Sequence, residues 1–279
     1  MFWHCRDFNL ELNHTLTMAI VNVTPDSFSD GGQYFTKDEA LRRVRNLIVE
    51  GAEIIDLGGE STRPGATPLS WQEEWQRLGP VLDSLFHESE NVPGVPVSVD
   101  TYHPETAEKA IAAGASIINC VKAESIAAMT KLARQSGCGL VLPFRLPTAG
   151  DGHAELAALL GGEDGLSSIA EQLMLDPMIG FDTTREEDIA LLGSIRRLAM
   201  LAPVLVGVSR KRLIKRLTGV KAKGAGKDLG GSLGAAVWCA MAGASVVRVH
   251  DVRETVQALR VANQLAAQTF ITDSREVIA

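Results

Sequence analysis

The chain has 279 residues, 46% of them hydrophobic, which is enough to bury the core of one large α/β barrel or of two smaller domains. Its formal net charge of −7 argues against a nucleic-acid partner, or an anionic membrane, bound through overall charge. No apolar run reaches the length that spans a bilayer, and the first residues lack a signal-peptide core, so no membrane partner is expected. The four cysteines have no metal-like spacing, which favours a reduced, cytoplasmic protein.

Short apolar, β-branched runs alternate with amphipathic stretches along the whole chain. The first run, Met18–Asn22, predicts a buried strand that ends in a polar, glycine-containing loop. Helical patterns follow the strands: Ser70 and Glu73 form a capping box at the start of one helix, Pro104 begins another, and the last ends near Ala267. The other predicted strands are 53–57, 95–100, 116–119, 139–143, 173–176, 204–208 and 245–250.

Eight buried strands separated by helices indicate a single (β/α)8 TIM barrel, an α/β fold. A doubly wound sheet is the alternative, but such sheets usually have fewer strands and often carry a GxGxxG turn, which the sequence lacks. No composition shift or linker divides the chain. We therefore expect one domain over residues 1–279, with 1–15 as an N-terminal extension and 269–279 as a C-terminal tail.

Polar side chains stand at the C-terminal ends of the predicted strands, which is where barrel enzymes place their active sites. A buried, unpaired amide or carboxylate is costly, so this convergence predicts a site rather than packing. Carboxylates and amides suit a flat heterocycle with N–H and carbonyl groups, whereas Arg63, Arg248 and His250 suit phosphate or pyrophosphate. Asn22 with a pyrophosphate offers the oxygen ligands that Mg²⁺ prefers. The polar strand ends are Asn22, Asp56, Asp100, Asn119, Asp176, Lys211, Arg248 and His250.

Six stretches of the sequence are recognisable together. They are NVTPDSFSDGG at 22–32, DLGGESTRPG at 56–65, DT at 100–101, LDP at 175–177, SRK at 209–211 and RVHDV at 248–252. With these motifs the chain resembles the dihydropteroate synthase family from about Met18 to Ala267. The resemblance implies a barrel transferase of folate biosynthesis, which condenses dihydropterin pyrophosphate with p-aminobenzoate and releases pyrophosphate.

The resemblance also implies a role for each matched residue. The pterin ring would be held by Asp100, Asn119, Asp176 and Lys211, and the pyrophosphate by Asn22, Arg248 and His250, with Mg²⁺ as cofactor at Asn22. The p-aminobenzoate pocket would be shaped by Phe28, Thr62, Arg63, Pro64, Phe181 and Ser209. Catalytic roles fall to Asp26, Arg63, Asp100 and Lys211, and the loops after the first two strands are expected to close over the substrates.

The chain departs from the family pattern along one arc of the barrel, from the fourth to the sixth strand. Cys120 stands where the family has Asp, residues 143–147 replace a Met-His-Met segment, and the loop after Asp176 loses a glycine and a lysine and gains Asp182. The stretch 148–172 is short and interrupted by glycines, so its helix is expected to be irregular. These changes are either neutral drift or an altered pterin and p-aminobenzoate pocket, with changed affinity for sulfonamides.

Two other classes of protein are alternatives. One is a catalytically silent or altered-acceptor paralogue that acts through protein contacts, and the other is a pterin-dependent methyltransferase barrel of the corrinoid type. The resemblance further implies a homodimer formed by the later helices, and the apolar stretches 195–202 and 233–241 offer such a face. Cys120, Cys138 and Cys239 are expected to be buried thiols.

Overall fold

The computed structural model describes residues 1–24, 37–60, 67–88, 94–147, 150–219 and 228–276, and from residue 267 onward only the course of the backbone. Within these residues, eight parallel strands form one sheet in the order β8-β7-β6-β5-β4-β3-β10-β9. The bridge between Leu175 and Val204, with a 2.8 Å hydrogen bond from the Leu175 amide to the Pro203 carbonyl, joins the two ends of the sheet. The predicted (β/α)8 barrel is therefore confirmed.

The strands agree with the predicted ones to within two residues at either end, which is the usual uncertainty of element boundaries. Their inner and outer faces are both covered, which explains why they read as continuous apolar runs. They are β3 (Leu16–Asn22), β4 (Ile54–Gly58), β5 (Val97–Asp100), β6 (Ile117–Asn119), β7 (Gly139–Pro143), β8 (Leu173–Asp176), β9 (Leu205–Gly207) and β10 (Val246–Val249).

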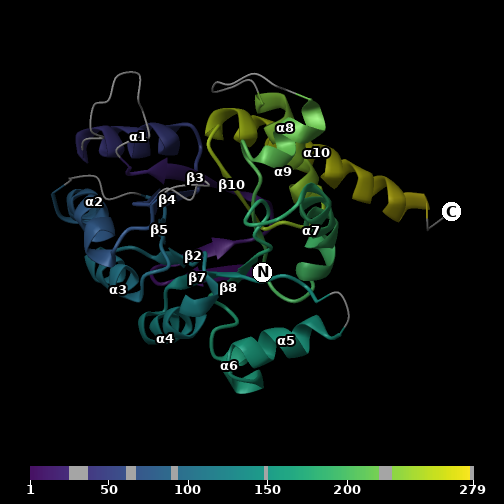
Figure 1. The fold of residues 1–279 in the computed structure, drawn as a ribbon. Helices are drawn as coiled ribbons and strands as arrows, with labels where there is room; N and C mark the ends of the chain where they lie inside the picture. The colour runs from purple at the N-terminus through teal and green to yellow at the C-terminus, as the bar shows by residue number, and fades with distance from the viewer. Residues whose placement is uncertain (25–36, 61–66, 89–93, 148–149, 220–227, 277–279) are drawn as a thin grey trace.

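Helices form a ring around the sheet (Figure 1). The capping box predicted at Ser70 and Glu73 is present at the start of α2. The helix α10 continues past its predicted end near Ala267, because neither Gly nor Pro interrupts its sequence, and it extends away from the barrel (Figure 1). The helices are α1 (Lys37–Val49), α2 (Trp71–Asp83), η1 (Ser84–Glu88), α3 (Pro104–Ala113), η2 (Ala123–Ser125), α4 (Ile126–Ser136), α7 (Arg185–Leu198), α8 (Arg212–Thr218), α9 (Leu229–Met241) and α10 (Val252–Glu276).

The segment between β7 and β8 has the irregular helix that its glycines predict. Two short helices, α5 (Gly152–Leu159) and α6 (Glu163–Ser167), replace one long helix. They are separated at Gly161 and Gly162, whose φ angles of 92° and 90° suit glycine and end α5.

The N-terminal residues form a hairpin that the sequence reading missed. β1 (Phe2–Cys5) pairs antiparallel with β2 (Phe8–Glu11), and Trp3 and Cys5 are fully buried. Trp3 Nε1 donates a 2.6 Å hydrogen bond to the Gln172 carbonyl. Arg6 donates to two carbonyls near the end of α3, at 2.7 and 3.0 Å. The hairpin therefore covers the N-terminal end of the barrel.

Side chains inside the barrel alternate along each strand, and this places the site. The lowest layer is apolar and packs against Trp3 and Cys5. Two residues further along several strands, the inward positions become polar, because successive side chains of a strand point to opposite faces. On four strands an apolar residue of the lowest layer is followed, two positions later, by a polar one: Ile54 by Asp56, Ile117 by Asn119, Met174 by Asp176 and Val246 by Arg248.

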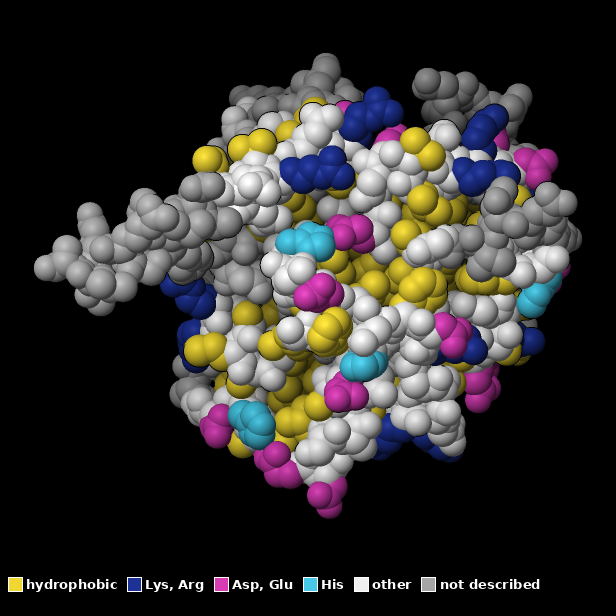
Figure 2. All heavy atoms as spheres, turned by 180° about the vertical axis from the view of Figure 1, so that it is seen from behind, with side chains coloured by type: hydrophobic (Ala, Val, Ile, Leu, Met, Phe, Trp, Pro, Cys, Tyr) yellow, Lys and Arg dark blue, Asp and Glu magenta, His cyan; other side chains and the backbone are white. Residues whose placement is uncertain are grey.

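All four cysteines are buried free thiols, as predicted for three of them. In the part of the chain that the structure describes, no helix combines the length and hydropathy needed to cross a membrane. One face of the molecule has hydrophobic side chains across its centre, and its Lys and Arg side chains lie toward the edge (Figure 2).

Candidate active site

An arginine at the end of β10 binds two carboxylates at the mouth of the barrel. Arg248 Nε donates to Asp56 Oδ2 at 2.6 Å, and Arg248 Nη2 donates to Asp100 Oδ2 at 2.7 Å. Asn119 Nδ2 donates to the same Asp56 oxygen at 3.3 Å. Asp56, Asp100, Asn119 and Arg248 come from four strands, so the barrel brings together four of the residues that the sequence placed at strand ends.

Two acceptor atoms in this cluster have no hydrogen-bond partner among the described residues. They are Asp56 Oδ1 and Asn119 Oδ1, on side chains that are 0% and 2% exposed as whole residues. Buried acceptors are normally satisfied, because leaving one unpaired costs about 1–3 kcal/mol. Two such atoms on side chains that hydrogen-bond to each other indicate a place for a ligand that carries N–H donors.

The charges in the cluster influence one another strongly. Burial raises the pKa of Asp100 to about 7, although the Arg248 guanidinium opposes the shift. Burial by itself would lower the pKa of Arg248, but Asp56 and Asp100 together raise it above its usual range. Arg248 is therefore a permanent cation in the site, while Asp100 changes its charge near neutral pH.

Lys211 and Asp176 form the second part of the site. Lys211 Nζ donates to the Ile179 carbonyl and lies 4.6 Å from the centre of the Phe181 ring. Burial lowers the pKa of Lys211 to about 8, against the opposing effect of Asp176. Burial also raises the pKa of Asp176, whose Oδ1 accepts a 2.7 Å hydrogen bond from the Met178 amide. A methyl group added to Gly207 would lie 3.7 Å from Lys211 Nζ and 3.9 Å from Arg248 Cβ, so the two parts of the site adjoin each other.

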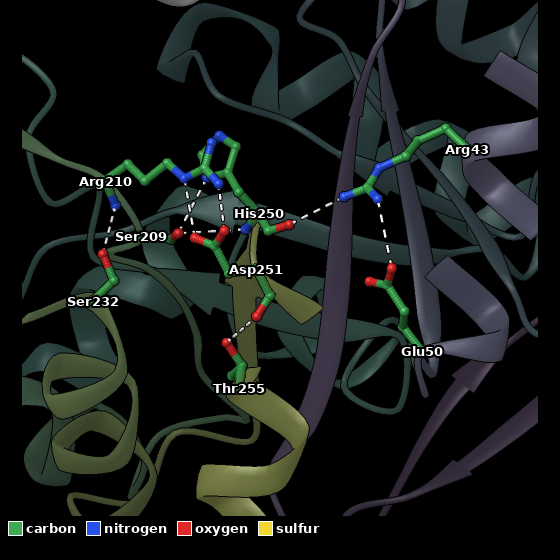
Figure 3. Close-up of polar contacts among 8 residues, drawn as sticks. All are labelled: Arg43, Glu50, Ser209, Arg210, Ser232, His250, Asp251 and Thr255. Atoms are coloured by element: carbon green, nitrogen blue, oxygen red, sulfur yellow. Dashed lines mark hydrogen bonds and ion pairs between the residues drawn. The ribbon is translucent and has the colours of Figure 1, made fainter. Parts of the chain in front are cut away.

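The third part of the site surrounds the first residues after β10 (Figure 3). His250 Nδ1 lies 3.1 Å from Ser209 Oγ, and the His250 amide donates to the same hydroxyl at 3.4 Å. Arg210 Nε donates to Asp251 Oδ2 at 3.0 Å, and Arg43 reaches from α1 to the His250 carbonyl at 3.3 Å. His250 and Ser209 are therefore held by backbone and side-chain contacts from several elements.

Asn22 lies on the strand next to this cluster. A methyl group added to Gly58 would be 3.7 Å from Asn22 Oδ1 and 3.7 Å from Asp100 Cβ, so the glycine leaves room between these two side chains. The described residues contain no group of three or more His, Cys, Asp or Glu side chains that could hold a metal ion. The amide oxygen of Asn22 is nevertheless a donor of the type that Mg²⁺ accepts, and Mg²⁺ needs few protein ligands when phosphates bind it.

The structure brings most of the predicted residues together and says nothing of others. Arg145 and Asp188 hold the loop after β8 and were not predicted. Arg145 lies in the atypical segment 143–147, and Asp188 looks like an ordinary acid in the first turn of a helix. Met178 and Asp182 in this loop have left-handed φ angles of 59° and 51°. The predicted residues Asp26, Phe28, Thr62, Arg63 and Pro64 lie outside the described residues.

Known proteins are similar to this chain in sequence and in structure. The family model described as pterin binding enzyme matches residues 18–153 and 165–250, and the gap between them falls in α5 and the start of α6. The dihydropteroate synthase of Escherichia coli K12 is 38% identical over 267 residues, covering 91% of this chain and 92% of that protein.

Two solved structures of the Xanthomonas albilineans dihydropteroate synthase are also similar. The one with 4-aminobenzoic acid has a TM-score of 0.80 and 37% identity, covering 95% of this chain and 98% of that chain. The one in complex with 7,8-dihydropteroate has a TM-score of 0.80 and 34% identity, covering 96% and 99%.

The barrel, its polar mouth and the matching family model define a pterin-binding barrel enzyme. The 38% identity to the Escherichia coli enzyme extends over nine tenths of both proteins, which identifies the family within this class of barrel enzymes. The chain belongs to the dihydropteroate synthase family of transferases. The comparisons give no support to the methyltransferase or to the silent paralogue.

Proposed function

We propose that this chain condenses 6-hydroxymethyl-7,8-dihydropterin pyrophosphate with p-aminobenzoate to give 7,8-dihydropteroate and pyrophosphate. The observation that carries the proposal is the pair of buried acceptors, Asp56 Oδ1 and Asn119 Oδ1, which have no partner among the described residues and whose side chains lie next to the Arg248 cation. A pterin ring supplies N–H donors for the acceptors, and its pyrophosphate is an anion for the guanidinium. The mouth of the barrel thus has hydrogen-bond acceptors for the pterin ring and a cation for the pyrophosphate.

The pterin ring is assigned to the deepest polar layer, where Asp100, Asn119, Asp176 and Lys211 meet. The carboxylates and the Asn119 amide oxygen accept from ring N–H and amino groups, and Lys211 donates to a ring carbonyl or nitrogen. Asp56, in contact with Asn119 and Arg248, joins this set.

The pyrophosphate is assigned to Arg248, His250 and Asn22. Arg248 binds Asp56 and Asp100 in the structure, and pterin N–H groups can replace it on Asp100, which leaves its donors for the pyrophosphate. Mg²⁺ is the proposed cofactor, with Asn22 Oδ1 as its protein ligand, and it would neutralise charge on the leaving group.

p-Aminobenzoate is assigned to the outer side of the site, against Phe181 and Ser209. The nucleophile is its neutral amine, which is reactive once it is positioned. The nitrogen forms a bond to the pterin methylene carbon, the carbon–oxygen bond to pyrophosphate breaks, and the amine loses a proton. Asp100 is close to the ring on which positive charge develops, so its carboxylate stabilises the transition state. Since sulfonamides resemble p-aminobenzoate in shape and charge, we expect them to compete for this pocket.

A homodimer is the proposed assembly, and the cytoplasm is the proposed location. Helices α7, α8 and α9 line an apolar groove of about 450 Å³. Ile189, Leu217 and Trp238 at this groove are 44%, 50% and 58% exposed, and exposed apolar side chains that gather at one place are typical of an interaction surface. A second copy of the chain, packed with the same face, would cover them.

The test measures pyrophosphate release by the purified protein with dihydropterin pyrophosphate and Mg²⁺, with and without p-aminobenzoate. The proposal expects release that depends on p-aminobenzoate, with 7,8-dihydropteroate as the other product. Release without coupling would mean that the acceptor differs, and the altered pocket at β6 to β8 would be the reason. Pterin binding without release would contradict the proposal and support the silent paralogue.

A further inference from the structure

The loop between β8 and α7, residues 177–183, carries two of the contacts that place Lys211. The Ile179 carbonyl accepts from Lys211 Nζ, and the Phe181 ring lies 4.6 Å from the same atom. This loop is also where the chain departs from its family, with Met178 and Asp182 in left-handed conformations that L-residues rarely adopt. Such a loop keeps its shape only if its surroundings hold it there.

Arg145, which follows β7, holds the carbonyl groups of this loop. Its Nη2 donates to the Phe181 carbonyl at 2.9 Å and to the Met178 carbonyl at 3.3 Å. Its Nε donates to the Pro177 carbonyl at 3.4 Å. The planar guanidinium presents its donors in a fixed arrangement, so three acceptors spread over five residues are fixed relative to one another.

Asp188, on the first turn of α7, holds the same loop from the other side. Its Oδ1 accepts from the Gly180 amide at 2.6 Å and from Thr183 Oγ1 at 2.6 Å, and the residue is only 5% exposed. A cation therefore binds the loop's carbonyls while an anion binds one of its amides. The two contacts complement each other, and neither side chain replaces the other.

We infer that Arg145 is a positioning residue for acceptor binding: by holding the 177–183 loop, it places the Phe181 ring against p-aminobenzoate. The inference rests on the proposed function. Arg145 binds the carbonyl of Phe181 itself, whereas it reaches the pterin residue Lys211 only through the Ile179 carbonyl of the loop, so its larger effect should fall on the acceptor side of the site. It also gives a physical reason for the atypical sequence after β7: the arginine there offsets the unfavourable backbone of the atypical loop after β8.

The experiment compares Arg145→Met, which keeps the length of the side chain without its donors, with Arg145→Lys and the wild-type protein. The matched control is Arg42→Met, since Arg42 is an exposed arginine on α1. For Arg145→Met we expect the KM for p-aminobenzoate to rise about tenfold or more, because small misplacements of positioning groups have effects of this size. The KM for dihydropterin pyrophosphate should rise clearly less than the KM for p-aminobenzoate, and the melting temperature should stay close to that of Arg42→Met. Arg145→Lys, with its charge and fewer donors, should recover part of the loss.

Hydrogen–deuterium exchange of the loop amides supplies a readout that needs no activity. Arg145→Met should speed the exchange of residues 177–183 and leave the strands unchanged. Unchanged exchange and unchanged KM would overturn the inference while the wild-type activity leaves the proposed function standing. An equal loss toward both substrates, with a lower melting temperature, would also overturn it, because the role would then be structural. If the wild-type protein shows no turnover, the proposed function is refuted, and with it the assignment to acceptor binding, even if Arg145→Met speeds the exchange of the loop.

Discussion

The two ends of the barrel interior use the same strands for different purposes. At the N-terminal end, Trp3 and Cys5 of the hairpin pack on an apolar layer that includes Ile54 and Ile117. Two residues further along the same strands, Asp56 and Asn119 are also buried, but each has an acceptor atom that no described residue pairs with. Burial alone therefore does not distinguish the ends. The lower layer, which packs on Trp3 and Cys5, stabilises the fold, whereas the upper layer, which contains Asp56 and Asn119, keeps costly polar groups that a ligand can satisfy.

The largest effect is expected at the upper end, from Arg248→Met. This change leaves Asp56 and Asp100 buried without their cation and removes a donor to the pyrophosphate. We expect kcat to fall by about 10²–10³ and the free energy of unfolding to fall by about 3–5 kcal/mol. Steady-state kinetics and urea denaturation measure the two effects, and Arg248→Lys is the control that keeps the charge. A variant with normal kcat would contradict the role of the upper layer.

Trp3→Ala tests the lower end. Its side chain is fully buried and donates to the Gln172 carbonyl, so truncation should lower the free energy of unfolding by about 3–5 kcal/mol. At a temperature where the variant is still folded, kcat should be unchanged within about twofold. Denaturation curves followed by fluorescence, together with the same kinetic assay, check both statements. A large loss of kcat in the folded variant would mean that the two ends are not separate.

The pH dependence of kcat/KM tests the charge states in the upper layer. Asp100 must be ionised to accept from the pterin, so kcat/KM should fall about tenfold per unit as the pH drops below about 7. Lys211 must be protonated to donate, so kcat/KM should fall again as the pH rises above about 8. Asp100→Asn should remove the acidic limb at a lower plateau. An acidic limb that survives this substitution would assign it to another group.

The smallest effect is expected from Arg6→Ala at the turn of the hairpin. Arg6 donates to the carbonyls of Ile111 and Ala115, and it is exposed enough for water to replace much of this bonding. The free energy of unfolding should fall by about 1 kcal/mol, with no change in kcat. Arg6→Lys, compared by the same denaturation measurement, shows how much of the effect needs the guanidinium. A loss as large as that of Trp3→Ala would mean that the turn contributes as much to the hairpin as the tryptophan does.

The barrel could be predicted from the sequence because each strand has an apolar pattern that can be read within a few residues. Runs such as 139–143 and 173–176 are apolar on both faces, and β7 and β8 have these bounds. The polar residues that end the strands, among them Asp100, Asn119 and Asp176, were predictable for the same reason, since parallel strands bring their C-terminal ends to one face.

The remaining features depend on contacts between distant residues. The strands β1 and β2, within Phe2 to Glu11, are too short to be recognised in the sequence. Their pairing is stabilised because Trp3 and Cys5 pack on the apolar layer at the N-terminal end of the barrel. The pairing of Arg248 with Asp56 spans 192 residues. The contacts of Arg145 and Asp188 with the 177–183 loop depend on how the segment after β7 and helix α7 pack against this loop. No local pattern in the sequence reports such contacts.

The most direct test of the upper layer is a crystal structure with dihydropterin pyrophosphate bound. We predict ring N–H groups within hydrogen-bond distance of Asp56 Oδ1 or Asn119 Oδ1, with Arg248 and His250 on the pyrophosphate. The guanidinium should then have left Asp100. A pterin bound elsewhere, with Arg248 still joined to both carboxylates and the two acceptors still unpaired, would contradict the account.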